Sequence, residues 1–75
     1  DDTFFDTKVT KKIFEDHLKN QHTTIQFGKI NDITAIKFHT VTADIELFLN
    51  NYRLQSMLKS IEYLKQNSGV LIFLN

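Results

Sequence analysis

The chain has 75 residues, and its nine Lys and Arg balance nine Asp and Glu, so the formal net charge at pH 7 is zero. This length has room for one small core, and we expect a single α+β domain over residues 1–75, taken from a longer intracellular protein. The absence of Cys excludes disulfides, thiolate metal sites and cysteine nucleophiles, and no apolar run approaches the roughly 20 residues that cross a membrane.

The first predicted element is a helix over residues 8–20. Asp6 or Thr7 can cap its N-terminus, because a short side-chain oxygen accepts from the free N–H groups of the first turn. Five side chains recur at helical spacing and predict a buried face: Val9, Ile13, Phe14, His17 and Leu18. The acidic lead-in of residues 1–6, with its Phe4–Phe5 pair, is expected to pack against the domain's own core.

From Thr23 the apolar period changes from 3.6 to 2, which is typical of half-buried strands. Residues 23–27 and 36–38 are predicted to pair as a hairpin around Asn31-Asp32, since both turn residues can bond their own main chain. A third strand is predicted over residues 44–49. An alternative stays open, because Ile45, Phe48, Leu49 and Tyr52 also fit a helical face that begins at Thr42 or Asp44.

A second helix follows, capped by Asn50 or Asn51, with Gly69 in the left-handed conformation that closes a helix. Its apolar stripe consists of Leu54, Met57, Leu58, Ile61 and Leu64. Residues 70–74 form the last strand. The predicted fold is therefore α+β, a two-layer sandwich of order α-β-β-β-α-β, with two helices on one face of a four-stranded sheet.

Signatures of catalysis are absent from the sequence. The two glycines stand alone at positions 28 and 69, so no Gly-rich phosphate loop exists, and no Ser lies in a nucleophile elbow. His17 and His22 are five residues apart, which does not match metal-ligand spacing on a helix. We expect no enzyme, no catalytic residue, no metal, no cofactor and no small-molecule substrate.

The last strand is apolar on both sides, so one set of its side chains must face away from the helices. We expect Leu71 and Phe73 to point outward and to form a contact patch with Phe48. Two alternatives are that the Phe4–Phe5 pair folds over this patch, or that a longer protein buries it. A second predicted contact surface lies opposite the stripe of the second helix and consists of Tyr52, Lys59 and Tyr63.

These features predict a non-catalytic interaction or assembly domain that binds another subunit or a second copy of itself through its outer sheet face or edge. One alternative is a nucleic-acid-binding domain that uses Lys8, Lys11, Lys12, Tyr52, Arg53, Lys59 and Tyr63. Zero net charge makes nucleic acid the less favoured partner. A third class is a regulatory subunit of the antitoxin or inhibitor type. No membrane partner is expected, and the predicted location is the cytoplasm or the nucleus.

Overall fold

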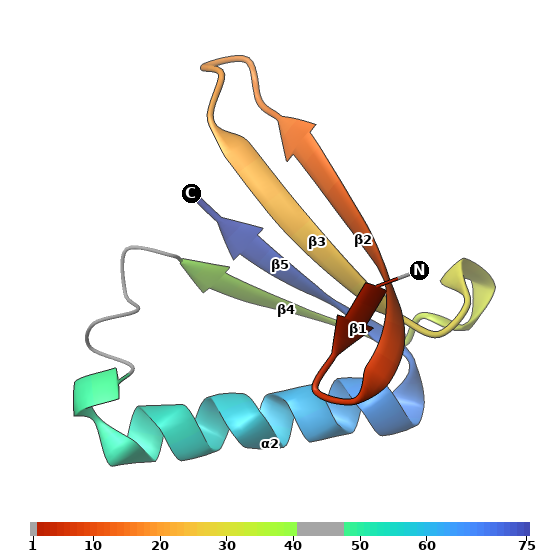
Figure 1. The fold of residues 1–75 in the computed structure, drawn as a ribbon, viewed down its shortest axis with the longest axis vertical. Helices are drawn as coiled ribbons and strands as arrows, with labels where there is room; N and C mark the ends of the chain where they lie inside the picture. The colour runs from red at the N-terminus through yellow and green to blue at the C-terminus, as the bar shows by residue number, and fades with distance from the viewer. Residues whose placement is uncertain (1, 41–47) are drawn as a thin grey trace.

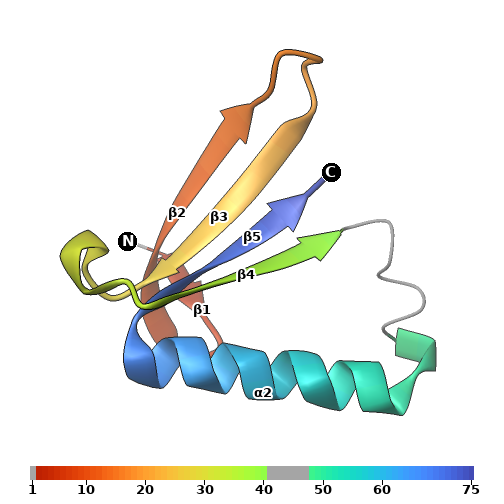
Figure 2. The ribbon, with the colours of Figure 1, turned by 180° about the vertical axis from the view of Figure 1, so that it is seen from behind.

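The computed structural model describes residues 2–40 and 48–75. The elements in chain order are β1 (Asp2–Phe4), β2 (Thr7–Glu15), β3 (Gln21–Phe27), a 3₁₀ turn η1 (Ile30–Asp32), β4 (Ala35–Thr40), α2 (Asn51–Asn67) and β5 (Gly69–Leu74). The five strands form one mixed sheet in the order β1-β2-β3-β5-β4. Figures 1 and 2 show α2 lying across one face of this sheet, while the β2–β3 hairpin extends away from the helix. No helix in the described ranges is long and apolar enough to cross a membrane.

The predicted fold of two helices on a four-stranded sheet is wrong, because residues 8–20 do not form a helix. Most of them belong to β2, which pairs antiparallel with β1 on one side and with β3 on the other. The i,i+4 charge pairs that favoured a helix stabilise it by only a few tenths of a kcal/mol each. Instead, residues 7–9 pair with β1 and residues 10–15 with β3, and the segment is rich in β-branched residues, which favour strands.

Residues 23–27 and 36–38 are strands, as predicted, but they do not pair with each other. β5 lies between β3 and β4, antiparallel to the first and parallel to the second. Asn31 and Asp32 lie in η1 rather than in a hairpin turn. β5 is thus paired along both of its edges, which satisfies its main-chain hydrogen-bonding groups. Its position between two neighbours separates β3 from β4.

The predicted third strand, residues 44–49, falls mainly outside the described residues, as do the alternative helix starts at Thr42 and Asp44. Within the described part, Phe48 and Leu49 are helical. The second helix and its cap are confirmed: α2 begins at Asn51, and the Asn50 side chain accepts a hydrogen bond of 3.2 Å from the Arg53 N–H.

The end of α2 differs from the prediction in one residue. Ser68, not Gly69, has the positive φ, at 60°. Gly69 is buried at the start of β5, where a Cβ would collide with the Leu64 side chain and lie 2.8 Å from the carbonyl oxygen of Ala35. Thr34 ties this end to the sheet, because its N–H donates to the Ser68 carbonyl at 3.0 Å and its hydroxyl to the Asn67 carbonyl at 2.8 Å.

The core lies between α2 and the face of the sheet that α2 covers, which we call the inner face. Its buried apolar side chains come from β2, β3, α2 and β5: Val9, Ile25, Phe27, Met57, Ile61, Leu64 and Leu71. Because neighbouring strand residues point to opposite faces, burial of Leu71 puts Val70, Ile72 and Leu74 on the other side. The last strand therefore faces the opposite way from the predicted orientation.

Candidate functional site

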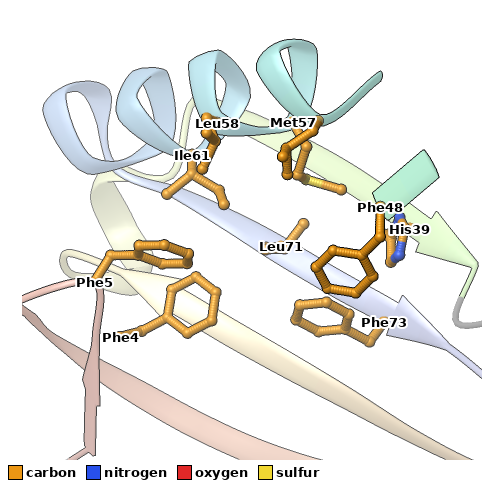
Figure 3. Close-up of a pocket in the computed structure, with 10 residues that line it drawn as sticks. Phe4, Phe5, His39, Phe48, Met57, Leu58, Ile61, Leu71 and Phe73 are labelled. Carbon is orange, nitrogen blue, oxygen red and sulfur yellow. The ribbon is translucent and has the colours of Figure 1, made fainter. Parts of the chain in front are cut away.

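An apolar pocket of about 280 Å³ lies between α2 and the inner face of the sheet (Figure 3). Of its described lining residues only His39 is not apolar; the lining consists of Phe4, Phe5, His39, Phe48, Leu54, Met57, Leu58, Ile61, Leu71 and Phe73. In Figure 3 the helix residues Met57, Leu58 and Ile61 lie on one side and Leu71 lies opposite them. We call this hollow the apolar pocket.

A cluster of aromatic side chains lies at each end of the apolar pocket. At one end the tight turn between β1 and β2 presents Phe4 and Phe5, whose rings meet edge to face with centroids 4.7 Å apart. Phe5 and Asp6 both have positive φ, 47° and 62°, a turn geometry that favours Asn and Gly and that costs a bulky residue free energy. The turn nevertheless aims the Phe5 ring at the pocket.

At the other end are Phe48, Phe73 and His39 (Figure 3). The His39 ring meets Phe73 edge to face at 5.8 Å, and Phe73 in turn contacts Phe4 with ring centroids 6.5 Å apart. Phe48 is 76% exposed. No described lining residue of the apolar pocket carries a permanent charge. The pocket is therefore suited to hold apolar groups.

The structure brings the predicted patch of Phe48, Leu71 and Phe73 together, but inside this pocket rather than on an outward face. Leu71 has no exposed surface. The alternative in which the Phe4–Phe5 pair folds over these residues agrees with the pocket lining and with the Phe4–Phe73 contact. A role for the three residues in binding a partner stays a prediction.

The second predicted surface is exposed on α2, with Tyr52 82% and Tyr63 54% exposed, and Tyr63 also lines a hollow beside Ala35 and Lys37 of β4. Tyr52 and Lys59 line one shallow hollow there, and Lys59 and Tyr63 line another. Their contact with a partner also stays a prediction. The basic helix face expected from Lys8, Lys11 and Lys12 does not form, because on strand β2 alternate side chains point to opposite faces.

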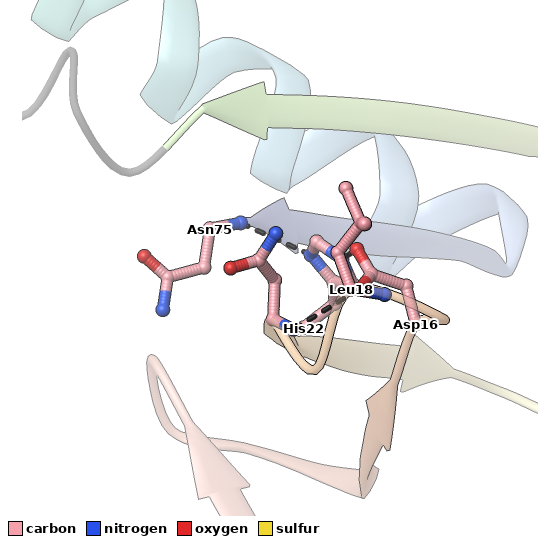
Figure 4. A network of polar contacts seen from close by, with 5 residues as sticks. Asp16, Leu18, His22 and Asn75 are labelled. Carbon is pink, nitrogen blue, oxygen red and sulfur yellow. Dashed lines mark hydrogen bonds and ion pairs between the residues drawn. The ribbon is translucent and has the colours of Figure 1, made fainter.

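Sequence reasoning missed a polar network around His22, which it considered as a metal ligand. His22 lies in β3 and is only 8% exposed. Its Nε2 is 2.9 Å from Oδ2 of Asp16, and its Nδ1 accepts a hydrogen bond of 3.0 Å from the Asn75 main-chain N–H (Figure 4). Since an N–H group can only donate, Nδ1 carries the lone pair, and the proton of the neutral ring is assigned to Nε2.

Asp16 organises the turn between β2 and β3. Its Oδ1 accepts hydrogen bonds from the N–H groups of Leu18, at 2.9 Å, and Asn20, at 3.0 Å. The hydrogen bond with His22, helped by those from the main chain, holds the pKa of Asp16 below its usual 3.8. Both ring nitrogens of His22 are thus occupied, and the pair ties the hairpin turn to the end of β5 rather than offering a free base. Detecting it from the sequence would have required the β2–β3 register, which pairs Phe14 with His22.

Comparison with known proteins finds curated relatives that share one name. No protein-family model matches the chain, and no solved structure matches it. Three curated relatives are each named 3,4-dihydroxy-2-butanone 4-phosphate synthase. That from Sulfurospirillum multivorans is 39% identical over 62 residues, covering 83% of this chain and 17% of the relative. That from Helicobacter hepaticus is 36% identical over 77 aligned positions, covering 96% and 22%. That from Wolinella succinogenes is 29% identical over 72 residues, covering 96% and 21%.

The chain therefore spans about a fifth of the length of the curated relatives it matches. These relatives are named as enzymes, and this finding contradicts the prediction of a non-catalytic interaction or assembly domain. The expectation that the protein is not an enzyme is wrong for the same reason. The two alternative classes, nucleic-acid binding and antitoxin-like regulation, also do not agree with the name that the relatives share.

Proposed function

We propose that this chain is one part of a longer enzyme that forms 3,4-dihydroxy-2-butanone 4-phosphate. The observation that carries this proposal is the extent of the match: relatives of that name align with 83% to 96% of the chain at 29% to 39% identity. For an enzyme of this kind we propose a cytoplasmic location. The lack of Cys in the chain agrees with this location.

The chemistry of the named product limits what the described residues would do in such an enzyme. A small ketone with two hydroxyls and a phosphate ester is strongly polar, and phosphate oxygens are best held by cationic or N–H donors. The apolar pocket offers aromatic rings and aliphatic side chains instead. In the Asp16–His22 pair, both ring nitrogens of His22 already take part in hydrogen bonds. We therefore assign no step of the reaction to either group.

An enzyme assay tests the proposal directly. The longest natural protein that contains this chain would be purified and incubated with a panel of sugar phosphates, because a phosphorylated four-carbon ketone is most directly formed from a phosphorylated sugar. We expect mass spectrometry and ³¹P NMR to detect 3,4-dihydroxy-2-butanone 4-phosphate with at least one sugar phosphate. The same mixtures without protein are the control. Absence of the product from every mixture would contradict the proposed function.

A further inference from the structure

The face of the sheet opposite α2, which we call the outer face, is apolar over two neighbouring strands. Five side chains lie on it: Ile36 and Phe38 from β4, and Val70, Ile72 and Leu74 from β5. The register places Ile36 beside Val70 and Phe38 beside Ile72. Because paired residues share a face of the sheet, the five side chains form one continuous surface. We call it the outer patch.

The outer patch is uncharged and open to solvent. Ile36 is 58% exposed and Phe38 59%, and no described α-helix covers this face (Figures 1 and 2). The face becomes polar at β3, where Thr24 and Gln26 lie opposite Ile72 and Val70. The outer patch amounts to on the order of 300 Å² of apolar surface, a size that in soluble proteins often marks a contact site.

β4 adds an open strand edge to the same surface. It is the last strand of the sheet, and no other described strand pairs with its free side. The charged residue of β4, Lys37, points to the inner face, so no charged side chain of β4 protects this edge on the outer face. Proteins usually cover such edges or place charged side chains on them, because an open strand edge otherwise pairs with strands of other chains.

We propose that the outer patch packs against the remaining part of the same polypeptide, through an uncharged apolar surface of that part. This inference rests on the proposed function, in which the chain belongs to an enzyme about five times longer. The relatives are of that length, so most of such a protein lies outside the described residues. A second copy of the chain is a poorer occupant, because a stable interface between separate proteins buries about 800 Å² on each side. A covalently linked partner needs less area, since the linkage supplies a high effective concentration.

Thiol labelling in the full-length protein tests this inference, because this chain has no Cys of its own. The substitution Phe38→Cys places a thiol in the outer patch. The control, Tyr52→Cys, places one on α2, at a site that is 82% exposed and on the opposite layer. Both sites are more than half exposed in the described structure, so without a cover both would react with a maleimide at similar rates.

We expect the thiol at position 38 to react at least ~100-fold more slowly than the thiol at position 52, as an interface that opens only transiently would require. Peptide mass spectrometry identifies the labelled site. A second probe of the outer patch is Ile36→Cys, which should be protected to a similar degree.

Each outcome bears on the proposal. Similar labelling rates at positions 38 and 52 would overturn it. Protection at position 38 that disappears on dilution would overturn it in favour of a second copy. Protection that is independent of concentration would support it. Assaying the same preparations for 3,4-dihydroxy-2-butanone 4-phosphate separates the two proposals: product with a reactive thiol at position 38 refutes only the interface, and protection without product refutes only the enzyme.

Discussion

At the scale of single residues, the Asp16–His22–Asn75 network joins three segments of the chain, one of them far away in the sequence. His22 bonds the hairpin turn through Nε2 and the end of β5 through Nδ1. Removing the ring would leave the Asn75 N–H and the Asp16 carboxylate without these partners. Leaving a buried polar group without a partner costs more free energy of folding than the hydrogen bond itself contributed.

We expect His22→Leu to lower the free energy of unfolding by about 1–3 kcal/mol, because a part-buried main-chain donor loses its acceptor. Chemical denaturation of the purified protein measures this change. The matched control is His17→Leu, at an exposed position in the neighbouring turn, where we expect a change within about 0.5 kcal/mol. Equal effects of the two substitutions would show that the network does not stabilise the fold.

Asp16 gives a pH dependence whose sign follows from its lowered pKa. The ionised carboxylate stabilises the folded state at pH above its usual pKa of 3.8, and the stabilisation is lost as the pH falls through the lower value of the folded protein. Asn at this position keeps the acceptor for Leu18 and Asn20 but carries no charge. We expect Asp16→Asn to be less stable than the unmodified protein near neutral pH, and the difference to shrink as the pH falls below about 4. Denaturation across this range measures it, with the exposed Asp32→Asn as control; a difference that stays constant with pH would contradict the assignment.

At the scale of elements, the junction of α2 and β5 carries one unfavourable backbone conformation. Ser68 has φ 60° and ψ 112°, a region that Gly occupies readily and other residues rarely. The hydrogen bonds that Ser68 makes to Thr34 use its main-chain carbonyl, so they do not depend on its side chain. We expect Ser68→Gly to raise the free energy of unfolding by about 0.5–1 kcal/mol. Gly69→Ala, one residue later, should lower it, because the new Cβ meets Leu64 and Ala35. Thermal unfolding distinguishes the two; a destabilising Ser68→Gly would contradict this account.

The orientation of β5 can be tested by one substitution made at two places. Leu71 is fully buried between the sheet and α2, whereas Leu18 in the β2–β3 turn is 70% exposed. We expect Leu71→Ala to lower the free energy of unfolding by about 2–5 kcal/mol, because it removes buried methyl groups and leaves a cavity. Leu18→Ala should change it by less than about 1 kcal/mol. Denaturant unfolding measures both, and a similar small loss at Leu71 would mean that β5 faces the other way.

At the scale of the whole molecule, the described residues leave apolar surface exposed at several places, among them the apolar pocket and the outer patch. A chain of this size buries only about 60% of its unfolded surface, so it has little stability in reserve. We expect the 75-residue chain produced alone to bind the dye ANS and to unfold with a free energy below about 5 kcal/mol. The longer enzyme proposed above should bind less dye per molecule. An isolated chain that binds no dye and is as stable as that longer protein would contradict this prediction.

The sequence by itself determined the elements whose patterns admit one interpretation. α2 follows from the stripe of Met57, Ile61 and Leu64 and from the cap at Asn50, since both signals are local. The strands at residues 23–27 and 36–38 follow from a period of two. The absence of recognisable catalytic motifs, by contrast, predicted a non-catalytic domain, and the enzyme name that the relatives share contradicts that prediction.

Only the tertiary structure decided the rest. Residues 8–15 form a strand because residues 7–9 pair with β1 and residues 10–15 pair with β3, and local spacing does not report such partners. The insertion of β5 between β3 and β4 separates the predicted hairpin and turns Leu71 toward α2. The apolar pocket brings together residues from both ends of the chain, and the His22 network joins the β2–β3 turn to Asn75 at the end of β5. Contacts of this kind depend on strand order and register, which are set by packing the whole sheet against α2 and which no local pattern specifies.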